Sequence, residues 1–296
     1  KLRAWCLPAL AVSALLLMLV LVPHVGIAAK GARRWLGVGS IRVQPSEFAK
    51  LTLIVFLAHY LAKEKRRIDQ FKRGFIVPMA VVGVTCLLAL AEPDFGTTAL
   101  MASVALAMMF IAGVRLRYLV PTVLSGLVAF AVLVMHSPVR MKRMLAFTDL
   151  EKYKADHGYQ VWQAMLAFGS GGINGLGLGN SRQKMFYLPE AHTDFIFPIV
   201  GEELGLIGTL GVLLLFAVLV ACGVIISMRT SDLFGQYLGL GITLLIALQA
   251  LINVGVVTAW LPTKGLALPF LSYGGSNVVM NLVAVGPPQV SPVVGS

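Results

Sequence analysis

Charged side chains are scarce in this sequence of 296 residues, with 13 acidic residues against 24 basic ones. Together they make up 12% of the chain, whereas a soluble domain contains about 25% charged residues. Hydrophobic residues account for 58%. The shortage of charge excludes a soluble globular enzyme, because its helices would need polar faces toward water. Intrinsic disorder requires low hydrophobicity and is excluded as well. The remaining class is a polytopic membrane protein.

Cysteine is also scarce, and Cys6, Cys86 and Cys222 lie far apart inside apolar segments. This spacing provides neither a disulfide framework nor a set of metal ligands. The sequence lacks a phosphate-binding Gly-Lys-Ser/Thr loop, so it gives no sign of a process driven by ATP hydrolysis. It also lacks the Gly-x-Ser-x-Gly and His-Glu-x-x-His signatures of hydrolases.

Long apolar runs fill most of the chain, and a membrane helix needs about 20 mostly apolar residues. We expect an all-α bundle of transmembrane helices that forms one integral membrane domain over residues 1–296. The basic start at Lys1 and Arg3 is expected to belong to the first span and not to a cleaved signal peptide. The eight predicted spans are 4–23, 48–62, 75–91, 97–113, 118–136, 198–228, 234–259 and 275–286.

Basic residues lie mainly in the loops between these runs, and the net charge is +11. Lipid headgroups and anionic lipid-linked substrates are therefore better partners than nucleic acid. Segment 63–73 carries six basic residues, which places it in the cytoplasm by the positive-inside rule. The outward loops are then 24–47, 92–96, 137–197 and 260–274.

Two of the outward loops are unusually basic. Loop 24–47 holds four basic residues and loop 137–197 holds seven. A long loop is translocated largely regardless of its charge, so these residues either lie in solvated loops or form a site for an anionic ligand on the outer face. Loops of this length are often functional, which favours the site. Within the longer loop, the glycine-rich run 169–179 predicts tight turns near the membrane.

The stretch 187–205 is the most informative for chemistry, because Asp194 stands there at the entrance of a long apolar span. An ionisable group at that depth is costly and is a functional candidate by default. A carboxylate balanced between burial and nearby cations can act as a general base. His192 is either part of the site or a hydrogen-bonded histidine at the interface. Glu202 and Glu203, about two helical turns later, either line the same cavity or cap and pack the helix.

A second group of candidates lies in residues 31–50. Glu47 falls in the first turn of a predicted helix and shares a helix face with Lys50. Pairing would offset the cost of placing both charges near the membrane, and the pair either serves the site or only orients the helix. The arginines of this segment are expected to bind either the phosphate oxygens of a ligand or the headgroups of lipids. These arginines are Arg33, Arg34 and Arg42.

The third group lies in residues 260–276, where two prolines and three glycines interrupt the helical pattern. Non-helical backbone at membrane depth is tolerated only where it is buried in protein or lines a water-filled cavity. Lys264 and Ser272 are then polar groups available to a ligand. In the outer turn 92–97, Asp94 is expected to cap the next helix.

Seven motifs occur in an order that resembles the SEDS family, the shape, elongation, division and sporulation proteins. They cover nearly the whole chain, and the run Leu261–Leu266 is more similar to the division branch than to the elongation branch. The family has ten spans, so this chain is expected to lack the first two and to end within the last. The seven motifs are Gly31–Trp35, Gln44–Lys50, Pro93–Thr97, Gly158–Gln160, Gly177–Ser181, Leu188–Phe195 and Ser272–Ser276.

The resemblance implies a peptidoglycan glycosyltransferase that polymerises lipid II at the outer face of the bacterial cytoplasmic membrane, at the division septum. By the family pattern, Asp194 is the general base that deprotonates the acceptor 4-hydroxyl, and undecaprenyl pyrophosphate is the leaving group. The predicted substrate-binding residues are Arg34, Trp35, Arg42, Glu47, Lys50, His192, Lys264 and Ser272.

The family also implies partners, which are a class B penicillin-binding protein and other membrane proteins of the division machinery. The one cofactor it suggests is a divalent cation, Mg²⁺ or Mn²⁺, on the substrate pyrophosphate, although no cluster of metal ligands is readable here. Two other functions stay open. A lipid II flippase would need charges along its whole path, whereas here they concentrate on the outer side. A non-catalytic scaffold for division proteins is the third reading, and an elongation-branch polymerase is the alternative within the family.

Overall fold

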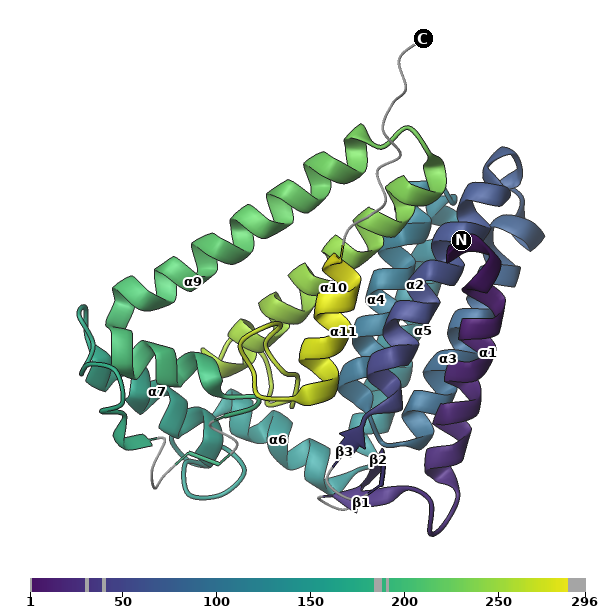
Figure 1. The fold of residues 1–296 in the computed structure, drawn as a ribbon. Coiled ribbons are helices and arrows are strands. Elements are labelled where there is room, and N and C mark those ends of the chain that lie inside the picture. The colour runs from purple at the N-terminus through teal and green to yellow at the C-terminus, as the bar shows by residue number, and fades with distance from the viewer. Residues whose placement is uncertain (1, 30–31, 39–40, 184–187, 190–191, 287–296) are drawn as a thin grey trace. The chain divides into compact units, whose positions relative to one another are not determined.

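The computed structural model describes residues 2–29, 32–38, 41–183, 188–189 and 192–286. Helices account for most of this part of the chain, so the predicted all-α class is confirmed (Figure 1). The elements in chain order are α1 (Leu2–Leu21), β1 (Ile27–Ala29), β2 (Ala32–Val38), β3 (Ile41–Val43), α2 (Pro45–Lys63), η1 (Lys65–Arg67), η2 (Phe71–Ile76), α3 (Val77–Ala91), α4 (Phe95–Ala112), α5 (Leu116–Met135), α6 (Pro138–Thr148), α7 (Tyr159–Gly171), α9 (Ile196–Arg229), α10 (Leu233–Val257) and α11 (Gly275–Val285).

Six helical segments in the described ranges are long and apolar enough to cross a membrane. Each matches a predicted span to within a few residues. The two remaining predictions, 48–62 and 275–286, are helices too, but they fall outside this set. One of them, α2, carries Glu47, Lys50 and Lys63, and the other, α11, has only 11 residues. The six segments are Leu2–Leu21, Phe71–Ala91, Phe95–Ala112, Leu116–Met135, Ile196–Arg229 and Leu233–Val257.

The chain divides into two compact units. Unit 1 contains residues 1–119, 220–246 and 275–296, and unit 2 contains residues 120–219 and 247–274. This division follows the density of contacts within each unit, and the prediction of one integral membrane domain over the whole chain stays a prediction.

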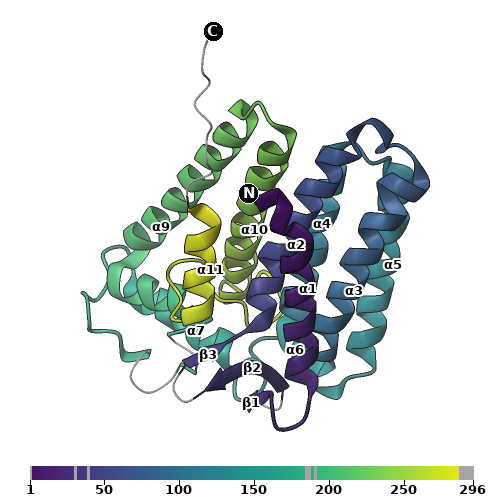
Figure 2. The same cartoon turned by 45° about the vertical axis from the view of Figure 1, so that its right-hand side comes forward.

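Within unit 1, α1, α2, α3 and α4 pack side by side, and α11 packs against α2 (Figures 1 and 2). The packed faces are apolar, with Leu53, Leu57 and Met108 almost fully buried. Small residues allow close approach between the parts of α9 and α10 that belong to this unit. A Cβ atom at Gly223 would lie 2.4 Å from Thr243 Oγ1, so glycine is required at this contact.

A small antiparallel sheet of three strands, called the hairpin below, connects α1 to α2 (Figure 2). Its register pairs Ile27 with Trp35 and Leu36 with Val43. The hairpin was not predicted, because its strands are only three to seven residues long and lack a strict alternation of apolar and polar residues. It carries the arginines of the outer-loop motif.

In unit 2, the described part of the predicted long loop 137–197 includes the helices α6 and α7 as well as the expected turns. Gly175, Gly177 and Gly179 have φ angles of 78°, 92° and 83°, which only glycine adopts without strain. Tight turns in this run are therefore confirmed. The apolar core of the unit joins α7 and the first residues of α9 to α10 and the segment that follows it. Its buried members are Val161, Ala164, Leu188, Phe195, Phe197, Ile199, Ala250, Val256, Val257 and Leu268.

The long helix α9 is broken at Gly205, where φ is 67° and ψ is −162°. The break leaves main-chain N–H and C=O groups of α9 without partners inside the helix, and the glycine-rich loop forms hydrogen bonds with them. Leu176 N donates to Glu202 O at 2.9 Å, and Leu206 N donates to Gly172 O at 2.9 Å. The loop therefore satisfies backbone groups that could find no partner in lipid.

Candidate active site

Asp194 lies two residues before α9 begins, at the entrance of the long apolar helix as predicted. The main chain of its segment is held at three successive carbonyl oxygens. Tyr273 N donates to His192 O at 2.8 Å. Ser272 Oγ donates to Thr193 O at 2.6 Å, and Asn253 Nδ2 donates to Asp194 O at 2.8 Å. The last turns of α10 and the interrupted segment that follows it thus fix the backbone from which the Asp194 side chain projects.

The carboxylate of Asp194 lies against Gly265. A Cβ atom at position 265 would come within 2.5 Å of Asp194 Oδ2. Asp194 is half-buried and Gly265 is exposed. Asp194 is therefore only partly buried, although the Asn253 and Ser272 side chains that anchor its backbone are buried.

The other predicted site residues of unit 2 differ in their burial and contacts. Ser272 is buried, and its hydroxyl accepts a hydrogen bond from Leu268 N at 2.6 Å in addition to the one it donates. The His192 side chain is exposed. Lys264 Nζ lies 5.7 Å from the centre of the Phe130 ring. Their binding of substrate stays a prediction, and Glu190, which is near them in the sequence, lies outside the described residues.

Glu202 is fully buried, and its carboxylate accepts four hydrogen bonds from the segment that leads toward Asp194. Ser181 Oγ binds Oε2, and Ser170 Oγ donates to Oε1 at 3.4 Å. The main-chain N–H groups of Arg182 and Gln183 donate at 3.2 and 3.3 Å. These contacts favour a packing role for Glu202 over a cavity shared with Asp194.

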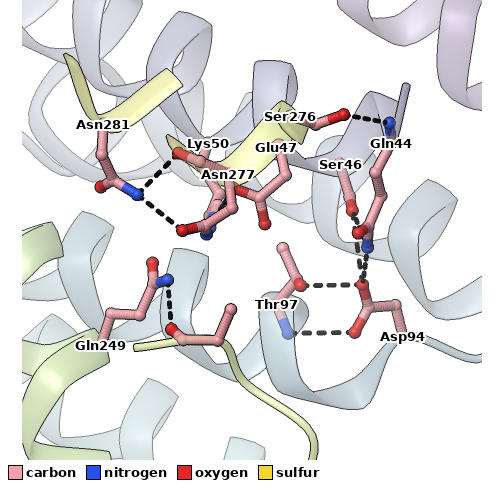
Figure 3. A network of polar contacts seen from close by, with 11 residues as sticks. Gln44, Ser46, Glu47, Lys50, Asp94, Thr97, Gln249, Ser276, Asn277 and Asn281 are labelled. Atoms are coloured by element: carbon pink, nitrogen blue, oxygen red, sulfur yellow. Dashed lines mark hydrogen bonds and ion pairs between the residues drawn. The ribbon is translucent and has the colours of Figure 1, made fainter. Parts of the chain in front are cut away.

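In unit 1, Lys50 Nζ lies 2.9 Å from Glu47 Oε2, and the two side chains are only 2% and 9% exposed. The predicted pair on one helix face is confirmed. Asn277 Nδ2 donates to the same Glu47 oxygen at 3.0 Å, and Asn281 Nδ2 donates to Asn277 Oδ1 at 2.9 Å (Figure 3). A buried ion pair needs such additional hydrogen bonds to offset the desolvation of its charges.

Asp94 caps α4 as predicted, because its side chain accepts from Thr97 N at 3.2 Å. It also accepts from Thr97 Oγ1 at 2.8 Å, from Ser46 Oγ at 3.3 Å and from Gln44 Nε2 at 3.2 Å (Figure 3). One carboxylate therefore joins the N-terminal ends of α2 and α4. Sequence reasoning missed the amide and hydroxyl partners, although a buried polar side chain in an apolar helix is itself a signal.

Arg34 and Trp35 both lie on β2. The Arg34 guanidinium donates to Glu92 O at 3.1 Å and to Pro93 O at 2.6 Å, which ties the hairpin to the turn between α3 and α4. Trp35 is half-buried, and the Arg42 side chain is exposed. Each of these three stays a predicted substrate ligand.

Glu92, in the turn between two membrane-crossing helices, was not singled out by sequence. Its side chain is fully buried, and neither carboxylate oxygen has a hydrogen-bond partner among the described residues. Burial raises the pKa of Glu92 to about 8, and the Asp94 charge acts in the same direction, whereas Arg34 opposes both. The group is therefore mostly protonated near pH 7.

The predicted site residues thus fall into two sets. Unit 1 holds one set, and unit 2 holds the set that contains Asp194. No group of three or more His, Cys, Asp or Glu side chains within the described ranges could hold a metal ion. The set in unit 1 is Arg34, Trp35, Arg42, Glu47 and Lys50, and the set in unit 2 is His192, Asp194, Lys264 and Ser272.

The fold and its buried polar groups define a multi-pass membrane protein. The sequence matches the family described as cell cycle protein, with FtsW, RodA and SpoVE as its namesakes, over residues 1–287. Stage V sporulation protein E of Bacillus subtilis is 44% identical over 284 residues, which cover 96% of this chain and 78% of that protein. The probable peptidoglycan glycosyltransferase FtsW of Trichlorobacter lovleyi is 45% identical, with coverage of 96% and 74%. This chain belongs to the FtsW, RodA and SpoVE family, and the SEDS resemblance is confirmed.

Solved structures agree with this assignment. A chain from a peptidoglycan synthase complex, studied for the coordination of polymerization and crosslinking, has a TM-score of 0.79 and 28% identity. The alignment covers 96% of this chain and 80% of that one. The rod shape determining protein RodA of Thermus thermophilus has a TM-score of 0.70 and 29% identity, with coverage of 96% and 76%.

Proposed function

We propose that this protein is a peptidoglycan glycosyltransferase that polymerises lipid II at the outer face of the bacterial cytoplasmic membrane. The observation that carries the proposal is the setting of Asp194. The residue is half-buried at the entrance of a membrane helix, and the backbone of its segment is fixed at three successive carbonyl groups. Membership of a family with relatives named peptidoglycan glycosyltransferases supports the reaction class.

In the proposed reaction, Asp194 accepts the proton of the acceptor 4-hydroxyl. The hydroxyl oxygen then forms a bond to the anomeric carbon of the donor sugar, and the bond from that carbon to undecaprenyl pyrophosphate breaks. The leaving group departs with the bonding electrons. A positioned general base contributes about 100- to 10,000-fold to such a step.

The negative charge of the leaving group requires cationic side chains. Arginine guanidinium groups match phosphate oxygens in a fork geometry, which suits the exposed Arg42, and Lys264 provides a point charge. Because Nε and Nη2 of Arg34 already donate to two main-chain carbonyl oxygens, Arg34 offers a phosphate its Nη1 side. Lys50 is bound to Glu47 in the interior of unit 1. We therefore assign the pair a role in keeping α2 and α11 in place, in addition to the substrate contact predicted from the family.

A divalent cation on the pyrophosphate is an expectation from the family. The described side chains form no cluster that fits such an ion. Every step above therefore uses groups of the chain and of the substrate alone.

We further propose that the protein acts in the division branch, at the septum, beside a class B penicillin-binding protein and other division proteins. Relatives named FtsW are 43–45% identical, whereas the RodA structure is 29% identical. The likeness to a chain of a peptidoglycan synthase complex supports a crosslinking partner.

The test is polymerisation of fluorescent lipid II by the purified protein, alone and with its partner. Asp194→Asn should reduce glycan formation at least about 100-fold because the base is lost. The matched control is Asp156→Asn, which changes an exposed aspartate of the same unit and should keep full activity. An Asp194→Asn variant that polymerises normally would contradict the assigned role. Transfer of lipid II across vesicle membranes without polymerisation would instead favour a flippase.

A further inference from the structure

We infer that Asn253 and Gly265 are positioning residues for the Asp194 carboxylate, an inference that rests on the proposed function. Asn253 comes from α10 and is 2% exposed. Its Nδ2 group donates to Asp194 O at 2.8 Å and to Leu266 O at 2.6 Å. An amide NH₂ group has two hydrogens, so this one side chain joins both main-chain segments.

Gly265 is adjacent to the second of these attachment points. Because it lacks a side chain, the Asp194 carboxylate occupies the space that a Cβ atom would fill, 2.5 Å from Oδ2. The amide of Asn253 holds position 194 from the buried side, and the bare backbone at position 265 allows the carboxylate to lie against it. Together the two residues determine the position of the Asp194 carboxylate.

The second polar group of Asn253 argues against a purely structural role. Its Oδ1 atom is buried without a hydrogen-bond partner in the described part of the chain. A buried acceptor left unpaired destabilises the fold, and an apolar side chain of similar size would avoid that cost. What the apolar side chain could not provide is the pair of donors that fixes Asp194.

Gln249 offers an internal comparison. It lies one helical turn earlier on α10, is equally buried, and donates from Nε2 to Ala267 O at 2.8 Å. It therefore anchors the same segment through Ala267. Removing either side chain loosens the segment after α10, and the change at Asn253 also removes a hydrogen bond to the main chain of Asp194.

The experiment compares Asn253→Leu with Gln249→Leu, and Gly265→Ala with Gly169→Ala, in lipid II polymerisation. Apart from its chain neighbours and the nearby backbone of its own helix, no heavy atom lies within 4 Å of a Cβ at Gly169, so this alanine is the control for a harmless glycine change. A displacement of about 1 Å at a reacting group costs about 100-fold in rate. Asn253→Leu and Gly265→Ala should therefore lower kcat about 10- to 100-fold with KM nearly unchanged. Gln249→Leu should lower kcat less than Asn253→Leu, and Gly169→Ala should stay within about 3-fold of wild type.

Thermal stability and the split between kcat and KM separate positioning from loss of stability. A positioning role lowers kcat beyond what the loss of melting temperature accounts for, whereas a purely structural role lowers both together. Equal losses in Asn253→Leu and Gln249→Leu that follow their thermal stability would overturn the inference. So would wild-type kcat in Gly265→Ala, which stays informative even if Asn253→Leu does not fold. If Asp194→Asn is inactive while these variants are fully active, the inference fails and the proposed function stands, whereas an active Asp194→Asn removes both.

Discussion

The two polar regions of the molecule differ in what their hydrogen bonds hold. Around Glu47, side chains bind other side chains, so that Lys50, Asn277 and Asn281 form one buried network. Around Asp194, the donors of Asn253, Ser272 and Tyr273 end on main-chain carbonyl groups. The first arrangement neutralises charge inside a helical bundle and serves stability. The second fixes a backbone and so determines the place of one side chain.

The largest effect is expected from a substitution in the network around Glu47, which tests whether this network stabilises the protein. Lys50→Met leaves Glu47 buried without its cation and should lower the free energy of unfolding by about 3–5 kcal/mol. Thermal unfolding in detergent measures this loss. The double change Glu47→Leu with Lys50→Met removes both charges and should recover most of the stability, although not the polymerase activity. Unchanged unfolding of Lys50→Met would show that the pair does not stabilise the bundle.

Glu202 sharpens the comparison, because here a side chain in unit 2 binds both hydroxyl and main-chain donors. In Glu202→Gln, one carbonyl oxygen must replace two carboxylate oxygens that accept four hydrogen bonds. The expected loss is about 1–3 kcal/mol, with faster proteolysis of the loop 172–183. Ser170→Ala removes only the longest of these bonds and should have a much smaller effect. Equal losses in the two variants would contradict the anchoring role.

Glu92 predicts a pH dependence of the stability of the folded protein. Its pKa of about 8 in the folded protein lies above its ordinary value of 4.5. As the pH rises from 4.5 to 8, the unfolded chain releases this proton first, so the folded state loses stability across that window. Glu92→Gln should flatten the decline of the melting temperature between pH 5 and pH 8. An identical slope in both proteins would argue against the raised pKa.

The smallest effect is expected at the exposed pair of Arg3 and Asp232 in unit 1, whose side chains are 51% and 53% exposed. The hydrogen bond from Arg3 lowers the pKa of Asp232. Exposed ion pairs contribute about 0–1 kcal/mol and are screened by salt, so Arg3→Ala should change the melting temperature only slightly. A loss as large as that of Lys50→Met would remove the distinction between buried and exposed pairs.

The helices could be predicted from the sequence because an apolar run of about 20 residues matches the length that a helix needs to cross a membrane. The Glu47–Lys50 pair and the Asp94 cap were predictable for a similar reason, since each depends on residues three positions apart. The hydrogen bond from Asn277 to Glu47 was not, because 230 residues separate the partners. The same holds for Asn253, whose amide contacts Asp194 at a separation of 59 residues. Contacts between residues so far apart produce no short-range pattern in a single sequence, so they could not be predicted from it.

The break at Gly205 has a mechanical consequence. Since the loop 172–177 supplies partners to the main chain on both sides of the break, straightening α9 and withdrawing the loop are one coupled motion. Neither can occur alone without leaving main-chain amide and carbonyl groups unpaired. A side chain at Gly175, which would come within 2.2 Å of Glu203 O, should therefore act at a distance and change the bend of a helix it does not belong to.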